Sequence, residues 1–407
     1  MSSSSIAVPS CGTPARITTD MWRAAGMVTA VFMLSNSPTP LYVVWQRTLG
    51  FSSGTLTVIF ALYIAGLLGT LLVAGQLSDR YGRKPVLLPG IAAALVACGL
   101  FACASSTAML AVARLLTGIA VGVIVSAGMA SVADLGGSAR KRDAALLASV
   151  AMVLGAGLGP LLAGGAGQVL AHPVMTVFGF EAVVLLSVFV IAWRLPLARP
   201  AKPHDSETAP LHLPSVPAQN RRHVASGIGV FGPGITATSF VLALGPSLLA
   251  RLLDVRSPLV AGGMACAMFL TATGVQFAAR RHSVRTLFLA GTAATTLSMG
   301  ALCAAVHASS APLLVIAALL AGAGQGLGQL GGLTLISLHV LDTRRAEANA
   351  VMNLGGYMPA GLLPVMTGYA IDAFGLATGA TAFAVTLALI ALGSGSLVFR
   401  SLARSGN

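Results

Sequence analysis

The chain has 407 residues, of which 56% are hydrophobic and only 9% are charged, and its mean hydropathy is +0.87. Because so few charged side chains cannot cover so much apolar surface, the composition excludes a soluble globular protein. The formal net charge of +13 raises the question of a nucleic-acid partner, which the placement of the basic residues answers below.

Apolar runs of about 20 residues, the length that crosses the hydrocarbon core of a bilayer, recur along the chain. The first part of the sequence predicts six spans, at 24–45, 55–77, 86–105, 108–132, 144–167 and 174–193. Six more spans are predicted at 225–250, 258–278, 286–307, 312–337, 348–371 and 376–398. The sequence therefore predicts an all-α membrane protein with twelve transmembrane helices.

A polar, Pro-rich segment divides these spans into two sets. We expect a cytoplasmic tail at 1–23, a six-helix half at 24–196, a cytoplasmic linker at 197–223, a second six-helix half at 224–399 and a tail at 400–407. The 47 glycines indicate helices that approach one another closely. The five cysteines have no paired spacing, so we predict neither a disulfide nor a metal site.

The basic residues gather on one side of the predicted membrane protein. With both termini in the cytoplasm, twenty Lys and Arg residues lie in inner segments. Three lie in outer segments, namely Arg47, Arg251 and Arg256, and Arg114 lies within a span. This bias follows the positive-inside rule and predicts a multi-pass protein of the cell inner membrane. We expect a monomer whose partners are the lipid bilayer and a small-molecule substrate, with no nucleic acid.

The second half of the chain repeats the first at a shift of 204 residues. Matched pairs include Gly118 with Gly322, Gly122 with Gly326, Pro160 with Pro364, and Gly164 with Gly368. Two parallel six-helix halves joined by a linker are typical of a transporter that rocks about a central site. An enzyme, a receptor or a scaffold has no evident need for the duplication.

Charge is concentrated directly after the second predicted span, in the stretch GQLSDRYGRKP. Gly75 would admit a neighbouring helix, and Gly82 would permit a tight turn. A carboxylate such as Asp79 is favoured at a helix N-terminus by the helix dipole. The alternative is that these charges only set the topology. That alternative suits Arg80 and Lys84 better than Asp79, because an acid does not contribute to a positive-inside bias.

This stretch resembles the G-x-L-a-D-R-x-G-R-K-x-x-L signature of the major facilitator superfamily, and the resemblance extends over the whole chain. It implies that Asp79 meets the start of the eleventh span and that Arg83 and Asp134 complete a charge cluster. Such a cluster would hold the inner faces of the halves together in the outward-open state. The resulting candidates for an inner gate are Gly75, Asp79, Arg80, Gly82, Arg83, Lys84 and Asp134.

The fifth span contains GAGLGPLLAGG, which resembles the G-x-x-x-G-P-x-x-G-G pattern of the drug–proton antiporter branch. The matching residues are Gly155, Gly159, Pro160 and Gly164, and Ala163 departs from the pattern. The glycines provide a flat packing face, and the proline is expected to kink the helix. A packing face of small residues without a transport role is the alternative. The Gly-Pro step favours an exporter.

Arg114 lies inside the fourth span, in RLLTGIAVG, which resembles the R-x-x-x-G pattern of the same branch. An arginine at membrane depth costs about 2.5–3.5 kcal/mol on insertion scales, so it is a functional candidate by default. Its expected partner is the stretch SNSPTPLY (35–42), where Pro38 and Pro40 free carbonyl groups and Asn36 adds a polar side chain. The alternative is that Arg114 snorkels to the outer interface.

Relatives in this branch often carry an acid in the first span, and this first span has none. By depth, Glu181 in the sixth span is the best candidate proton carrier, although the sixth span commonly packs at the periphery. In the second half, Gln325 and Gln329 are one turn apart, as are Asn353 and Tyr357. Each pair either faces a cavity or bonds a neighbouring helix.

Together these features predict a secondary active transporter, a proton-coupled exporter of a small, fairly apolar compound that works by alternating access. The alternatives are an importer or uniporter of a metabolite and, from another class, a non-transporting receptor or scaffold. The sequence contains no nucleophile–base constellation and no Walker loop, so we predict neither an enzyme nor an ATP-driven pump. No cofactor is expected beyond the proton gradient as energy source.

Overall fold

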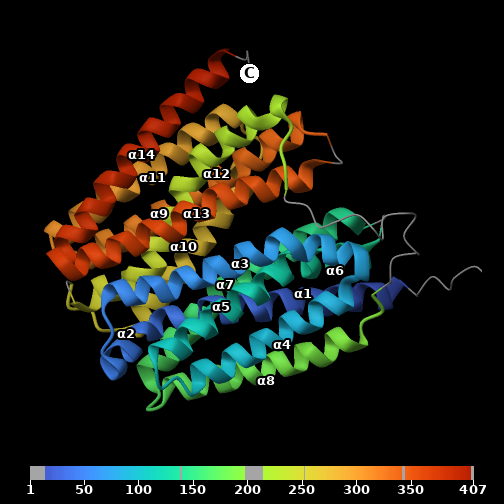
Figure 1. The fold of residues 1–407 in the computed structure, drawn as a ribbon, viewed down its shortest axis with the longest axis horizontal. Helices are drawn as coiled ribbons and strands as arrows, with labels where there is room; N and C mark the ends of the chain where they lie inside the picture. The colour runs from blue at the N-terminus through green and yellow to red at the C-terminus, as the bar shows by residue number, and fades with distance from the viewer. Residues whose placement is uncertain (1–13, 138–139, 198–213, 252, 342–343, 405–407) are drawn as a thin grey trace, which may run out of the picture.

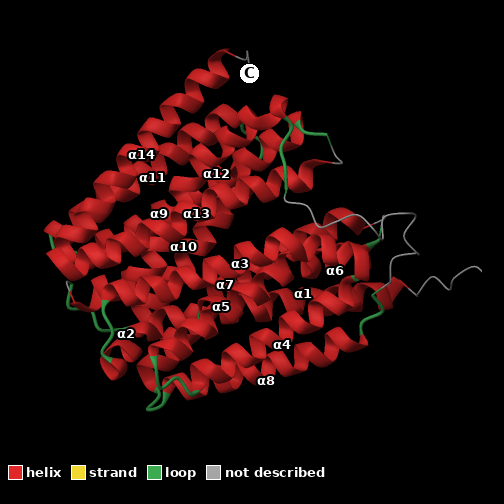
Figure 2. Cartoon of the chain, in the orientation of Figure 1, coloured by secondary structure: helices red, strands yellow, loops and turns green. Residues whose placement is uncertain are grey.

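The computed structural model describes residues 14–137, 140–197, 214–251, 253–341 and 344–404. In these residues every regular element is a helix, as Figure 2 shows. The first half contains α1 (Pro14–Asn36), α2 (Pro38–Leu49), α3 (Ser53–Tyr81), α4 (Arg83–Ala102), α5 (Thr107–Val123), η1 (Ile124–Gly128), α6 (Met129–Gly136), α7 (Lys141–Val169) and α8 (Pro173–Arg194). The second contains η4 (Ala218–Asn220), α9 (Arg221–Arg251), α10 (Pro258–Ala279), α11 (Val284–His307), α12 (Ala311–His339), α13 (Arg345–Phe374) and α14 (Leu376–Arg404).

These elements form the expected spans. Helices α1 and α2 together make the first span, and α5, η1 and α6 together make the fourth through a π-helical turn. Each remaining span is a single helix. By length and hydropathy, eleven helical segments in the described part of the chain qualify as membrane-crossing, and α13 is not among them. Its sequence carries two prolines as well as Arg345, Glu347 and Asn353, which lower its hydropathy.

Three helices extend past the expected ends of the spans. Helix α1 begins at Pro14, so residues 14–23 of the expected tail are helical, and a proline suits the first helical position. Helix α9 begins at Arg221, inside the expected linker 197–223, and α14 continues to Arg404, inside the expected tail 400–407. The other residues of the tails and most of the linker lie outside the described part.

The molecule has two ends that differ in sequence. We call the end with the linker the linker end; it carries Gly82 and the last residues of α6, α8, α10 and α12, which are Gly136, Arg194, Ala279 and His339. We call the other the far end; it carries the turns near residues 50–52, 103–106, 170–172, 253–257, 308–310 and 375. In Figure 1 the linker end lies to the right and the far end to the left.

The sequence repeat corresponds to a repeat of packing. A Cβ added at Gly118 on α5 would overlap the carbonyl oxygen of Tyr63 on α3. A Cβ added at Gly322 on α12 would overlap the carbonyl oxygen of Met268 on α10. In both halves, therefore, backbones touch at matched positions, which only small residues allow.

The two halves meet through α3 with α13 and through α7 with α10. Glycines again permit the contact: a Cβ at Gly262 would overlap the carbonyl oxygen of Pro160, and one at Gly368 would overlap Oγ1 of Thr57. Both contacts lie toward the far end. In Figure 1 the described helices of the two halves diverge toward the linker end, and the close glycine contacts between the halves lie toward the far end.

Candidate functional site

The first span is broken at Ser37, between α1 and α2. Pro38 and Pro40 lack amide hydrogens, so the helix cannot continue its regular backbone bonds across this turn. The last regular bond runs from the backbone N–H of Ser37 to the carbonyl of Met33 at 3.2 Å, and the Ser37 hydroxyl donates to the same carbonyl at 2.9 Å. The break predicted from the two prolines is present. Asn36, next to it, donates to the Ser35 hydroxyl at 2.9 Å.

Arg114 on α5 binds the two sides of this break. Its Nη1 donates to the carbonyl oxygen of Ser35 at 2.6 Å, and its Nε donates to the hydroxyl of Tyr42. The contact expected between Arg114 and residues 35–42 is therefore present. Only 1% of Arg114 is exposed, so the guanidinium does not reach the interface as the snorkelling alternative requires.

Aromatic rings surround the same guanidinium. The Cζ atom of Arg114 lies 5.1 Å from the ring centre of Tyr42 and 5.7 Å from those of Phe60 and Tyr63. Ring faces attract a cation, most strongly away from water. The Nη2 atom is buried and has no hydrogen-bond partner in the described part of the chain. The two N–H groups of Nη2 thus remain available for an acceptor.

Glu181 on α8 reaches the break from another direction. It is 2% exposed, and its Oε1 atom forms a hydrogen bond with the Ser37 hydroxyl. Its Oε2 atom is buried without a partner among the described residues. The expected peripheral position of the sixth span is correct for most of α8, where Val183 and Trp193 are exposed. One face of α8 nevertheless directs Glu181 inward, onto the broken first span.

The glycine motif of the fifth span packs directly behind the break. A Cβ at Gly155 would overlap the carbonyl oxygen of Thr29, and one at Gly159 would overlap that of Met33. The same Cβ at Gly159 would lie 3.0 Å from the Ser37 hydroxyl. The motif therefore lets α7 touch α1 where α1 ends. The other two motif residues contact α10. Gly164 packs against the carbonyl oxygen of Pro258, and the carbonyl oxygen of Pro160 packs against Gly262.

The polar candidates of the second half were expected either to face a cavity or to bond a neighbouring helix, and they differ in this respect. Gln329 accepts a hydrogen bond from Gln276 on the neighbouring α10 at 3.3 Å. The Oε1 atom of Gln325 is buried and has no partner in the described residues. Asn353 on α13 is half-buried. Tyr357, one turn further, packs against the apolar clusters of both halves and therefore lies on the seam between them.

Arg83 gathers the predicted charge cluster at the linker end. Its Nη1 atom lies 2.6 Å from Oδ1 of Asp79, and its Nε atom lies 3.0 Å from Oδ2 of Asp134. The preceding turn is made by Gly82, whose φ of +94° favours glycine, as predicted. All these groups belong to the first half. The side chains of Asp79 and Asp134 are 72% and 56% exposed.

One expectation for this loop is wrong in the conformation seen here. No neighbouring atom of the described residues lies within 4 Å of a Cβ placed on Gly75, so none of the described helices approaches it. The reason is that the halves are separated at this end. Arg80 lies over the ring of Tyr81 at 5.4 Å, and Lys84 is in the first turn of α4. The expected meeting of Asp79 with the eleventh span belongs to the other conformation and stays a prediction.

A family model described as Major Facilitator Superfamily matches residues 24–281, which is more than half of the chain. The chain belongs to the major facilitator superfamily. It is 30% identical over 171 residues to the multidrug resistance protein MdtL of Escherichia coli O127:H6 and of Escherichia coli O6:K15:H31. The match covers 39% of this chain and spans about 40% of the length of those relatives.

Solved major facilitator structures share the fold. A bacterial homolog of the human lysosomal transporter Spinster, in an inward-facing and unoccupied conformation, superposes with a TM-score of 0.77 at 13% identity, covering 97% of this chain and 99% of that one. The nucleoside transporter NupG (D323A mutant) gives 0.70 at 14% identity, covering 94% and 99%. At these identities the likeness shows the fold alone.

In a major facilitator protein the contacts between the halves decide which end is open. At the far end, Asp372 on α13 accepts hydrogen bonds from the backbone N–H groups of Ser53 and Gly54, at 2.9 and 2.7 Å, and so caps α3 of the other half. The shift of 204 residues places Gln168 at the matching position, and Gln168 accepts from Ser257 at 2.8 Å. We call these two contacts the outer latches. They were not among the features expected from the sequence.

Proposed function

We propose that this major facilitator protein is a proton-coupled exporter of small, fairly apolar compounds. We further propose that it lies in the cell inner membrane with its linker end in the cytoplasm. The described conformation, joined at the far end and separated at the linker end, is then the one that takes up substrate from the cytoplasm. The superposed Spinster homolog has an inward-facing conformation, which supports this assignment.

The observation that carries the proposal is the pair of ionisable groups on the broken first span. Glu181 contacts the break at Ser37, and Arg114 contacts it at Ser35. In the described part of the chain, neither group has an ion-pair partner. Removing an isolated charge from water is costly. A change in the charge of Glu181 or Arg114 therefore changes the free energy of their contacts with the broken first span.

The hydroxyl of Ser37 suggests how a proton enters this contact. It has one hydrogen and lies within bonding distance of two oxygen atoms, those of Met33 and Glu181. A hydroxyl can donate only once, so both bonds form together when Glu181 carries a proton and donates it. After loss of that proton, the Glu181 carboxylate and the Met33 carbonyl would compete for the single hydrogen of the Ser37 hydroxyl. Glu181 would thus supply, from the sixth span, the acid that the first span lacks.

The surroundings of Arg114 support the substrate class. The rings of Phe60, Tyr63 and Tyr357 lie at the seam between the halves, and they offer apolar faces. The free Nη2 atom of Arg114 offers its two N–H groups to a polar acceptor on the substrate. The name of the partial relative MdtL, a multidrug resistance protein, favours export of such compounds.

Transport by proteoliposomes tests this function. A panel of neutral aromatic compounds is offered to the reconstituted protein under an imposed pH gradient, and uphill movement of each compound is followed. We expect movement that stops when the gradient is dissipated. For Glu181→Gln, we expect loss of uphill movement while exchange of compound down its own gradient continues. Transport that ignores the gradient would instead indicate a uniporter, and movement of compounds only with the proton flow would indicate an importer.

A further inference from the structure

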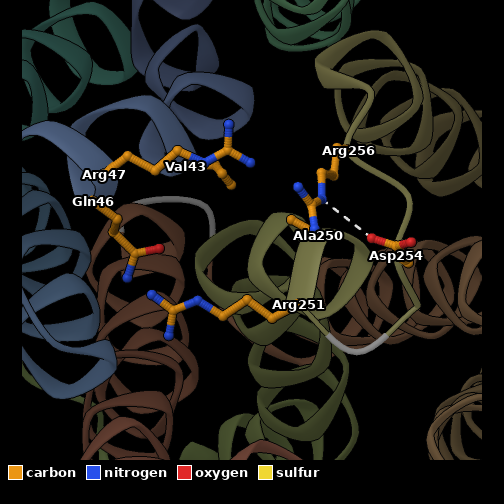
Figure 3. A pocket seen from close by; sticks show the side chains of 7 residues that line it. All are labelled: Val43, Gln46, Arg47, Ala250, Arg251, Asp254 and Arg256. Atoms are coloured by element: carbon orange, nitrogen blue, oxygen red, sulfur yellow. Dashed lines mark hydrogen bonds and ion pairs between the residues drawn. The ribbon is translucent and has the colours of Figure 1, made fainter.

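A pocket of about 490 Å³ lies at the far end, between α2 of the first half and the end of α9 in the second. Figure 3 shows the polar side chains that line it: Gln46, Arg47, Arg251, Asp254 and Arg256. The three arginines are the same three that the loop count assigns to the outer side. They oppose the positive-inside bias of the chain, yet they converge on one cavity.

The positive charge of this pocket is not balanced by the residues that line it. Arg256 pairs with Asp254, with 3.1 Å between Nε and Oδ1. Arg47 and Arg251 form no ion pair with any described residue. Three guanidinium groups and one carboxylate therefore leave an excess of two positive charges. The pocket lies where an anion can offset them.

Gln46 adds a buried donor. It is 6% exposed, and its Oε1 atom accepts a hydrogen bond from Ser247 at 3.1 Å. Its Nε2 atom is buried and has no partner among the described residues. In Figure 3 the amide of Gln46 points toward the guanidinium of Arg251. Because both groups are donors, an acceptor between them would satisfy both.

We propose that this pocket binds an oxyanion of the phosphate type between the two halves. Arg47 and Gln46 approach the anion from the first half, and Arg251 and Arg256 approach it from the second. Guanidinium forks bind phosphate oxygens in pairs, which suits this donor set. The volume is in the range of small-molecule pockets, so it leaves space for a substituent on the phosphate. The anion is either a free solute or the headgroup of an anionic phospholipid.

The site is separate from the broken first span. Gln46 lies nine residues beyond Ser37, which corresponds to roughly 14 Å along a helix. Its effect follows from its position: without an anion, Arg47 and Arg251 repel each other across the seam. A bound anion contacts both halves, and separation of the halves at this end divides the donors. The anion therefore stabilises the conformation with the far end joined. This proposal does not depend on the direction of transport.

The test uses the full chain in detergent, with spin labels at T48C and L259C to measure the separation of the halves at the far end. Inorganic phosphate is titrated against chloride at equal ionic strength. We expect phosphate, and not chloride, to increase the joined population at least twofold. We expect the double variant Arg47→Gln, Arg251→Gln to bind phosphate at least fivefold more weakly. Arg285→Gln, which removes an exposed arginine at the linker end, is the matched control and should keep the response.

Two lipid environments distinguish the sources of the anion. If the ligand is a headgroup, nanodiscs of phosphatidylglycerol raise the joined population over those of phosphatidylcholine, and added phosphate then has no further effect. If the ligand is a solute, the two nanodiscs behave alike and phosphate acts in both. The proposal is overturned if neither phosphate nor phosphatidylglycerol changes the population. It is also overturned if Arg285→Gln weakens the response as much as the double variant.

Discussion

The two ends of the molecule hold charge in different ways. At the far end, Asp372 reaches across the seam and caps a helix of the other half. At the linker end, Asp79 pairs with Arg83 four residues away, inside its own half. A carboxylate thus joins the halves at the far end, whereas Asp79, in the last turn of α3, is paired within its own half at the linker end.

The comparison indicates how the molecule selects a conformation. Asp372 caps a helix of the opposite half in this structure, and Asp79 is expected to do the same when the linker end closes. The backbone dipole of a helix attracts an anion to its N-terminus whatever the side chains around it are. We predict that alternating access exchanges one cap for the other, with the broken first span between them.

The largest effect is expected where the far end is closed most tightly. In Gly262→Leu, the new side chain must push Pro160 of the other half away. Overpacking of this kind costs about 3 kcal/mol, which corresponds to roughly a 100-fold shift away from the joined far end. Spin-label distances across α7 and α10 measure the shift. Gly263→Leu is the matched control, because no neighbouring atom of the described residues lies within 4 Å of a Cβ placed there. Equal shifts in both variants would contradict the assigned contact.

The next effect concerns Arg114, which binds the broken first span between the two ends. Arg114→Lys keeps the charge and loses the planar fork that binds Ser35 and Tyr42 together. A buried hydrogen bond to a charged group contributes about 1.5–3 kcal/mol, so we expect transport to fall about 10- to 100-fold. Arg114→Ala should be impaired only slightly more. Transport is measured at matched protein levels in proteoliposomes. Full activity of Arg114→Lys would show that the fork is not needed.

A smaller effect is expected from Asp79, the carboxylate at the linker end. Asp79→Asn removes only the charge that is expected to cap the eleventh span when that end closes. The charge–dipole interaction contributes about 1 kcal/mol, so the population with the linker end closed should fall about fivefold, and transport with it. Asp143→Asn, an exposed acid in the first turn of α7, is the control. Accessibility of a cysteine placed at the linker end reports the population. Unchanged accessibility and transport in Asp79→Asn would contradict a role of this carboxylate in closing the linker end.

Local features could be predicted from the sequence. Two prolines within three residues predict the break in the first span, and an arginine inside an apolar run predicts a buried partner for it. In the described part of the chain, eleven of the spans qualify by length and hydropathy. The twelfth, α13, is too polar to qualify by that measure. The family signature indicated the members of the charge cluster, because they lie in one loop and at one helix end.

Contacts that depend on helix rotation or on conformation could not be predicted. Nothing in the sequence of α8 indicates which way Glu181 faces, because a peripheral helix is apolar on most of its surface. The latch at Asp372 uses the backbone amides of Ser53 and Gly54, more than 300 residues away, and amides carry no sequence signature. The expectation for Gly75 was wrong because it describes the conformation with the linker end closed.

The last predictions concern the two outer latches, where the neutral contact is expected to give the smallest effect of all. Hydrogen bonds to a charged group are stronger than neutral ones, but solvent near Asp372 reduces its contribution to about 1 kcal/mol. The neutral bond between Gln168 and Ser257 is expected to contribute about 0.5 kcal/mol.

Asp372→Asn should therefore lower the joined far-end population about fivefold and Gln168→Ala about twofold, as spin-label distances report. Double-mutant cycles of Gln168→Ala with Ser257→Ala, and of Asp372→Asn with Gly262→Leu, show whether each latch acts through its own contact. If Asp372→Asn leaves the population unchanged, the charge on Asp372 adds nothing. The difference between the two ends would then lie in packing and not in the exchange of helix caps.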